Sequence, residues 1–149
     1  YAAIIGVENW YKRDWKKEIN NQNKILQVWL KLLAKEKFKG ITHEIIADPT
    51  GNKINRLRMH VNSKISKFTV QSLCYHLEKN KPAIFVRDDL IHLNHFELDT
   101  CNLKQGQEKV VMNELKKIIV KLNSGKIKNN ISQKEYSVKS NKEWLSWLN

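Results

Sequence analysis

Three arginines are the side chains of this chain best suited to bind an anionic group. Arg56 and Arg58 are two residues apart, and Arg87 ends a short apolar run. A guanidinium group matches a carboxylate with two parallel hydrogen bonds and keeps its charge at neutral pH. The alternative roles are structural: Arg87 could pair with Asp88 or Asp89, and Arg56 and Arg58 could lie on the solvated face of an edge strand.

Other reactive residue types lack the spacing that their chemistry needs. His92 and His95 would point to opposite faces of an extended strand, so with Asp99 and Cys101 they do not predict a metal site. No local signature of Ser-His-Asp or Cys-His catalysis is present, so we assign no catalytic residue. Helical spacing favours packing against another domain or subunit, over base stacking, for three tryptophans: Trp10, Trp15 and Trp29.

The elements that must position these residues begin with a helix. Apolar residues recur at three- and four-residue steps within residues 1–39, which predicts one long helix; they are Ile19, Leu26, Trp29, Leu30 and Leu33. Lys37, Lys39 and a C-cap at Gly40 indicate its end. The β-branched segment 41–47 then predicts a strand.

The central segment is predicted to continue the sheet. Residues 48–52 (Asp-Pro-Thr-Gly-Asn) have turn chemistry, and the strict alternation of 54–61 predicts a second strand. Its two faces carry Leu57, Met59 and Val61 on one side, and Arg56, Arg58 and His60 on the other. Ser66 is the expected N-cap of a helix with an apolar stripe: Phe68, Leu73, Cys74 and Leu77.

Two further strands and a helix are expected after Pro82. The runs 83–87 and 90–98, joined by a turn at Asp88 and Asp89, predict strands, and 105–122 predicts a helix. Residues 123–149 are polar and rich in lysine and asparagine, and they end in Trp144-Leu145-Ser146-Trp147-Leu148. We expect this aromatic pair to dock as a short helix on the body of the same protein.

The order of elements predicts an α+β fold. A two-layer sandwich, with a small antiparallel or mixed sheet covered by helices on one face and preceded by a long linking helix, accommodates it. The predicted division is a linking helix at 1–39, a small α+β domain at 40–122, and a basic tail at 123–149.

Composition is that of one compact soluble domain. The chain has 149 residues, 41% of them hydrophobic, and a formal net charge of +12 spread along its length. Its two distant cysteines favour a reducing compartment, and we expect a cytoplasmic protein without a membrane span. Residues 2–7 read like the middle of a buried helix, so we expect a fragment of a longer protein.

Three stretches together resemble the end of a fold-type-I pyridoxal-phosphate enzyme of the selenocysteine-synthase-like branch. The first is Val7-Glu8-Asn9-Trp10-Tyr11 with Arg13-Asp14-Trp15, and the second is Asp48-Pro49-Thr50-Gly51 followed by Arg56-Leu57-Arg58-Met59. The third is the most specific. It runs from Lys81-Pro82 to Arg87-Asp88, then through Phe96-Glu97-Leu98-Asp99 to Leu103-Lys104-Gln105-Gly106-Gln107-Glu108.

The resemblance covers about four fifths of the chain and is greatest to D-glucosaminate-6-phosphate ammonia-lyase-like proteins. It implies the small C-terminal domain of a lyase or transferase that acts as a homo-oligomer, such as a dimer. The family's large domain, with the Schiff-base lysine and most of the pyridoxal 5'-phosphate site, would lie upstream. In such enzymes a small-domain arginine commonly binds the substrate, which implies Arg87 first, then Arg58 and Arg56, as ligands of an amino-acid or amino-sugar-acid substrate.

Two other functions remain compatible with the residues. A basic module could bind nucleic acid or another polyanion, which a steep salt dependence of binding would reveal. A truncated protein with a structural or interaction role is the other. Whether the arginines and lysines are paired with carboxylates helps to decide among these functions.

Overall fold

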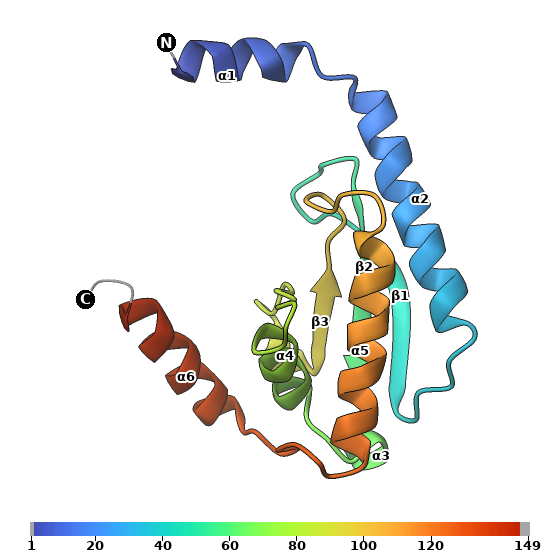
Figure 1. Ribbon diagram of the computed structural model, residues 1–149, viewed down its shortest axis with the longest axis vertical. Helices are drawn as coiled ribbons and strands as arrows, with labels where there is room; N and C mark the ends of the chain where they lie inside the picture. Colours follow the sequence, from blue (N-terminus) through green and yellow to red (C-terminus); the bar gives the residue numbers. More distant parts are fainter. Residues whose placement is uncertain (1, 147–149) are drawn as a thin grey trace.

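The computed structural model describes residues 2–146, and it describes the burial of side chains for residues 3–139 and 142. Helices and a small sheet make up the chain (Figure 1). In chain order the elements are α1 (Ala2–Tyr11), α2 (Trp15–Leu33), β1 (Ile41–Ala47), β2 (Asn55–Val61), α3 (Ser63–Ser66), α4 (Val70–Glu78), the 3-10 helix η1 (Ile91–Leu93), β3 (His95–Leu98), α5 (Gln107–Asn123) and α6 (Gln133–Ser146).

The sheet is antiparallel, and β2 is its central strand. Strand order is β1-β2-β3, and Leu57 of β2 lies opposite Ile45 on one side and Leu98 on the other. Because side chains alternate along a strand, Leu57 and Met59 share one face while Arg56 and Arg58 share the other. The predicted alternation is therefore confirmed, but Arg56 and Arg58 lie on a central strand and not on an edge strand.

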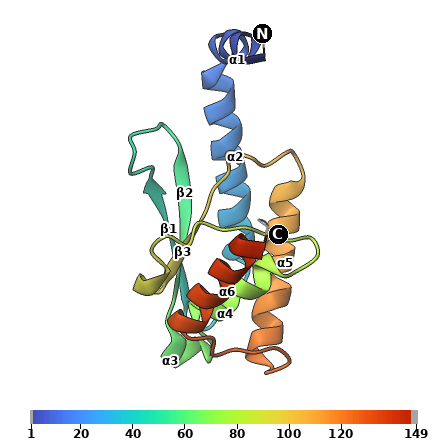
Figure 2. The same ribbon diagram turned by 90° about the vertical axis from the view of Figure 1, so that its left-hand side faces the viewer.

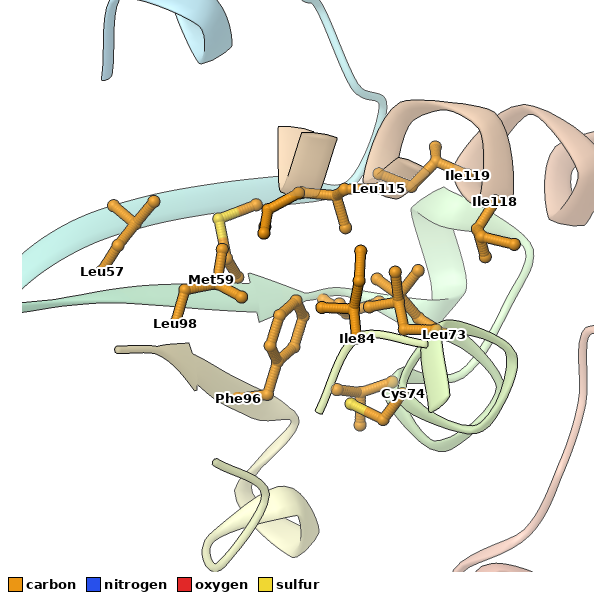
Figure 3. Close-up of a cluster of buried hydrophobic side chains, with 14 of the residues drawn as sticks. Leu57, Met59, Leu73, Cys74, Ile84, Phe96, Leu98, Leu115, Ile118 and Ile119 are labelled. Carbon is orange, nitrogen blue, oxygen red and sulfur yellow. The ribbon is translucent and has the colours of Figure 1, made fainter. Parts of the chain in front are cut away.

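Helices α2, α4 and α5 cover the apolar face of the sheet (Figure 2). Leu57, Met59, Phe96 and Leu98 of the sheet belong to one cluster of buried side chains that also includes Leu73 of α4 and Leu115 of α5 (Figure 3), and each of the four is at most 4% exposed. The indole Nε1 of the buried Trp29 donates to the carbonyl of Glu108 at 3.0 Å, which fixes α2 against the start of α5. The predicted α+β class, with helices layered on a small sheet, is confirmed.

The single long helix predicted for residues 1–39 is wrong. The chain leaves the helix after Tyr11, and the Asp14 carboxylate accepts the Lys17 backbone N–H at 3.0 Å, which caps a new helix. Helix α2 ends at Leu33, so Gly40 is not its cap. Gly40 instead has a φ of +74° and approaches α3 so closely that a Cβ would lie 2.6 Å from the Ser66 nitrogen.

The predicted N-cap at Ser66 is also wrong. Ser66 ends the short helix α3 and donates its hydroxyl to the Phe68 carbonyl at 2.9 Å. Thr69 caps α4 instead, with its hydroxyl accepting the Ser72 N–H at 3.2 Å. The apolar stripe predicted for this region is buried even so, because Phe68 packs into the core just before α4 begins.

The sheet has fewer strand residues than expected after Pro82. Within 83–87 only Arg87 joins the sheet, through an isolated antiparallel bridge to Glu97. Residues 91–93 form the 3-10 turn η1 because the Ile91 and Leu93 N–H groups bond to the Asp88 and Leu90 carbonyls. Strand β3 is thus only His95–Leu98, whereas the helix predicted at 105–122 is confirmed as α5.

The start of the tail packs on the body next to α4. Ile131 is fully buried and Tyr136 is 8% exposed. Thr69 donates its N–H to the Asn129 carbonyl at 2.9 Å, and Ile131 donates its N–H to the Ser72 hydroxyl at 2.8 Å. The predicted docking of Trp144 and Trp147 concerns side chains outside the described residues.

Helix α1 projects away from the body (Figure 1), and several of its apolar side chains are exposed. Ile4, Ile5, Val7 and Trp10 are each more than half exposed. Among the described helices, none combines the length and the apolar character that a membrane crossing requires.

Candidate functional site

The polar face of the sheet brings all three predicted arginines together. Arg58 of β2 lies between Glu44 of β1 and Glu97 of β3, because the register places it opposite both residues. The bridge between Arg87 and Glu97 adds Arg87 to this group. We call Arg56, Arg58, Arg87, Glu44, Asp48, Glu97 and Asp99 the arginine–carboxylate network.

Arg56 is the buried centre of the arginine–carboxylate network. Its side chain is 5% exposed, with one terminal nitrogen 2.6 Å from Asp48 Oδ2 and the other 3.1 Å from Glu97 Oε2. Its Nε lies 3.6 Å from Asp99 Oδ2. A guanidinium that is buried among three carboxylates already has anionic partners, so Arg56 ties β2 to the 48–52 turn and to β3.

Arg58 is also engaged with carboxylates, although it is less buried. Its Nη2 lies 2.8 Å from Glu97 Oε1, and its Nη1 lies 3.7 Å from Glu44 Oε1. The side chain is 24% exposed. A substrate carboxylate at Arg58 would therefore have to compete with Glu97.

Arg87 is the arginine of the network that is open to solvent. Its side chain is 46% exposed, and its Nε donates to Asp99 Oδ2 at 3.1 Å. Its expected structural partners, Asp88 and Asp89, do not pair with it among the described residues. Two backbone hydrogen bonds to Glu97, of 2.9 and 2.8 Å, fix the Cα position. The guanidinium is thus anchored through Nε, and within the described residues its terminal nitrogens have no hydrogen-bond or ion-pair partner.

The carboxylates of the network are held in their charged form. Hydrogen bonds from the Thr50 hydroxyl and N–H, with the nearby Arg56, lower the pKa of Asp48 from 3.8 to about 2. Burial raises the pKa of Glu97, but hydrogen bonds from Arg58 and Arg56 outweigh burial and lower it. Burial likewise opposes the hydrogen bonds from Cys101 and Arg87 that lower the pKa of Asp99.

The carboxylate members of the network were not identified from the sequence. Asp48 was assigned only to a turn, and Glu97 and Asp99 to the end of a strand. The alternation of Arg56 and Arg58 indicated a shared face, but their partners depend on the order of the strands. A weak signal was available in Glu44 and Glu97, which fall in two of the segments predicted as strands, 41–47 and 90–98.

Two other side chains border the network: His60 Nε2 lies 3.0 Å from Glu44 Oε1, and the Cys101 thiol bonds to Asp99. His92 lies in η1 and His95 in β3, where burial lowers the pKa of the His95 imidazole. Partial desolvation and the neighbouring Asp99 raise the pKa of the Cys101 thiol to about 11, so it is protonated near neutral pH and a poor nucleophile. Cys74 is buried, and neither cysteine forms a disulfide.

Comparison with known proteins shows that the fold of this chain is similar to part of a solved structure. No protein-family model matches the chain, and no curated protein sequence matches it. Among solved structures, D-glucosaminate-6-phosphate ammonia-lyase is similar, with a TM-score of 0.62 and 21% sequence identity. The match covers 78% of this chain but only 30% of that one. The chain therefore has the fold of one part of a much longer ammonia-lyase polypeptide.

Proposed function

We propose that this chain is the small domain of a pyridoxal-phosphate-dependent lyase or transferase, and that Arg87 binds the carboxylate of an amino-acid or amino-sugar-acid substrate. The observation that carries the residue assignment is the difference among the three arginines. Arg56 and Arg58 each bond to buried or half-buried carboxylates, whereas Arg87 is 46% exposed and anchored through Nε alone. The fold likeness to a part of an ammonia-lyase supports the assignment to this class of enzyme.

The geometry of Arg87 favours end-on binding of a carboxylate. Asp99 occupies the Nε position, so the two terminal nitrogens remain for the two oxygens of the substrate. Asp99 would act as a positioning residue, because it fixes the rotation of the guanidinium plane. Arg58 and Arg56 are secondary candidates, since each would have to exchange an internal carboxylate for the substrate.

Under the proposal, the large domain of the complete enzyme packs against exposed apolar side chains of this chain. Phe85, two residues before Arg87, is 78% exposed, and helix α1 presents Ile4 and Val7 to solvent. Contact with a second domain at Phe85 would remove water from around Arg87. Less water strengthens the attraction between a guanidinium and a carboxylate, because the effective dielectric constant falls.

The cofactor belongs outside this chain under the proposal. A phosphate group needs several convergent donors, and in the described residues Arg87 is the only arginine of the network whose terminal nitrogens have no ion-pair partner; it lies next to the carboxylate of Asp99. The chain on its own therefore does not fit pyridoxal phosphate. When bound elsewhere in the complete enzyme, the cofactor supplies the electron sink, and this chain contributes substrate orientation. Assembly into a dimer and a cytoplasmic location stay predictions.

Substitution of Arg87 in the complete protein tests the assignment. Arg87→Ala should raise KM for the substrate about 10- to 100-fold, because a hydrogen bond to a charged group contributes about 1.5–3 kcal/mol. Arg87→Lys is the matched control, since it keeps the charge but loses the planar pair of donors. It should recover only part of the binding. Asp99→Asn should raise KM by less and leave the cofactor content unchanged.

Two results would contradict this proposal at different levels. An unchanged KM in Arg87→Ala would remove Arg87 from substrate binding but leave the enzyme class intact. A complete protein that contains no pyridoxal phosphate would reject the class itself.

A further inference from the structure

The tail, residues 123–149, reaches the segment that carries Arg87. Its helix α6 contacts α4 (Figure 2), and Tyr136 of α6 is only 8% exposed. The Tyr136 hydroxyl donates to Asp88 Oδ2 at 2.6 Å, across 48 residues of sequence. Because Asp88 directly follows Arg87, this hydrogen bond joins the tail to the place where the arginine leaves the sheet.

Arg87 and Asp88 are held from opposite sides. The backbone of Arg87 pairs with Glu97, and its guanidinium Nε donates to Asp99, so both of these bonds connect Arg87 to the end of β3. Successive side chains of an extended segment point in opposite directions, and Asp88 accordingly points toward α6. The bond from Tyr136 therefore adds a restraint that the sheet does not supply.

The hydrogen bond between Tyr136 and Asp88 has the properties of a lasting contact. A hydroxyl that donates to a carboxylate forms one of the stronger hydrogen bonds in proteins. Burial and the bond to Asp88 raise the pKa of the Tyr136 hydroxyl, so it stays protonated and remains a donor near neutral pH. The base of the tail is also fixed, because the Ile131 N–H donates to the Ser72 hydroxyl of α4 at 2.8 Å.

We propose that Tyr136 and Asp88 are positioning residues of the substrate site, and that the docked tail holds Arg87 in the orientation that binds a carboxylate. The proposal rests on the proposed function of Arg87. Residues 79–90, between α4 and η1, form no helix, and within them only Arg87 pairs with the sheet. An arginine on such a segment needs a second point of attachment, because a small displacement of a binding group weakens its interaction with the substrate.

Removal of one hydroxyl tests this role in the complete protein. Tyr136→Phe should raise KM about three- to tenfold, less than Arg87→Ala, because the arginine remains but adopts more orientations. The value of kcat should stay nearly unchanged, whereas a merely structural defect would lower the amount of active enzyme, and so the apparent kcat, without a change in KM. Amide hydrogen exchange of residues 83–90, followed by mass spectrometry, should also become faster, and this measurement needs no activity.

Two control variants isolate the hydrogen bond. Asp88→Asn keeps an oxygen that accepts the Tyr136 hydroxyl, so its KM and its exchange should lie near those of the unsubstituted protein. Tyr75→Phe makes the same chemical change in a tyrosine of α4 whose ring lies 4.3 Å from the ammonium group of Lys139. The Tyr75 hydroxyl has no hydrogen-bond partner within the described residues, so this variant should change neither value.

The outcomes separate the positioning role from the proposed function. An unchanged KM in Tyr136→Phe, with a raised KM in Arg87→Ala, would overturn the positioning role and leave the function of Arg87 standing. Unchanged exchange of residues 83–90 in Tyr136→Phe would overturn the positioning role as well. An unchanged KM in Arg87→Ala would reject the proposed function, and the positioning role would fall with it.

Discussion

Arg56 and Arg87 have the same side chain and touch the same carboxylate, yet their surroundings differ. Arg56 is 5% exposed and has three acidic neighbours, while Arg87 is 46% exposed and has one. Removal of one member of a buried ion network leaves the others charged and without partners in a region of low dielectric constant. Removal of an exposed partner lets water replace it.

This difference predicts different costs to stability. Arg56→Met should lower the free energy of unfolding by about 3–5 kcal/mol, whereas Arg87→Ala should lower it by about 1 kcal/mol or less. Urea unfolding of both variants, followed by circular dichroism, measures the two values. Equal losses would mean that Arg87 is a structural residue like Arg56, and its role in substrate binding would lose its basis.

The lowered pKa values of the carboxylates predict acid sensitivity. A carboxyl group whose pKa is lower in the folded state binds fewer protons there than in the unfolded chain, so its contribution to stability is present above the unfolded pKa and is lost as pH falls. For Asp48 that interval runs from 3.8 to about 2. Urea midpoints should therefore drop between about pH 4 and pH 2, and Asp48→Asn should reduce the drop. A midpoint that is constant over this interval would contradict the network.

At the scale of elements, the segments that carry a complete local signal could be predicted. Strand β2 alternates strictly over Asn55–Val61, and α5 has an unbroken helical stripe, so periodicity identified both. The break before Asp14 was not predicted, because the apolar spacing resumes within one turn of the helix. The Asp14 side chain is nevertheless a signal for a helix N-cap. Residues 83–86 were wrongly predicted as part of a strand, because a run of apolar residues does not distinguish a paired strand from an extended segment that lies beside one.

The partners of the arginines could not be derived from any single element. Which carboxylate faces Arg58 is determined by the register with β1 and β3, and a shift by one residue would exchange the faces. The sequence therefore predicted the three arginines and the shared face of Arg56 and Arg58, while the place of Arg87 beside them and the four carboxylates emerged only from the sheet.

A buried residue in segment 123–149 tests whether this tail is part of the folded core. Ile131 is 0% exposed and lies beyond the last core helix, so it belongs to the core despite the polar composition around it. Ile131→Ala should lower the free energy of unfolding by about 2–5 kcal/mol. Val138→Ala is the matched control, because Val138 is 45% exposed on α6 and its truncation should cost almost nothing. A small effect of Ile131→Ala in denaturant unfolding would make the tail an appendage of the fold.

For the whole molecule, local ion pairs engage part of the positive charge. Several lysines on the helices are paired with glutamates: Lys116 with Glu36, Lys117 with Glu114, and Lys128 with Glu135. These pairs fit the interpretation of the lysines as solvated surface residues, and they give the polyanion-binding alternative no specific support. The exposed apolar side chains of α1 fit the proposal that another protein surface packs against this helix.

The most direct test of the central claim is the subunit mass and the pyridoxal-phosphate content of the native protein that contains this chain. Capture with an antibody against the chain, followed by mass spectrometry and cofactor analysis, provides both values. Our account predicts a subunit much larger than 17.6 kDa, since the fold corresponds to 30% of the ammonia-lyase chain, with pyridoxal phosphate bound to it. A native subunit of 17.6 kDa without the cofactor would contradict the account.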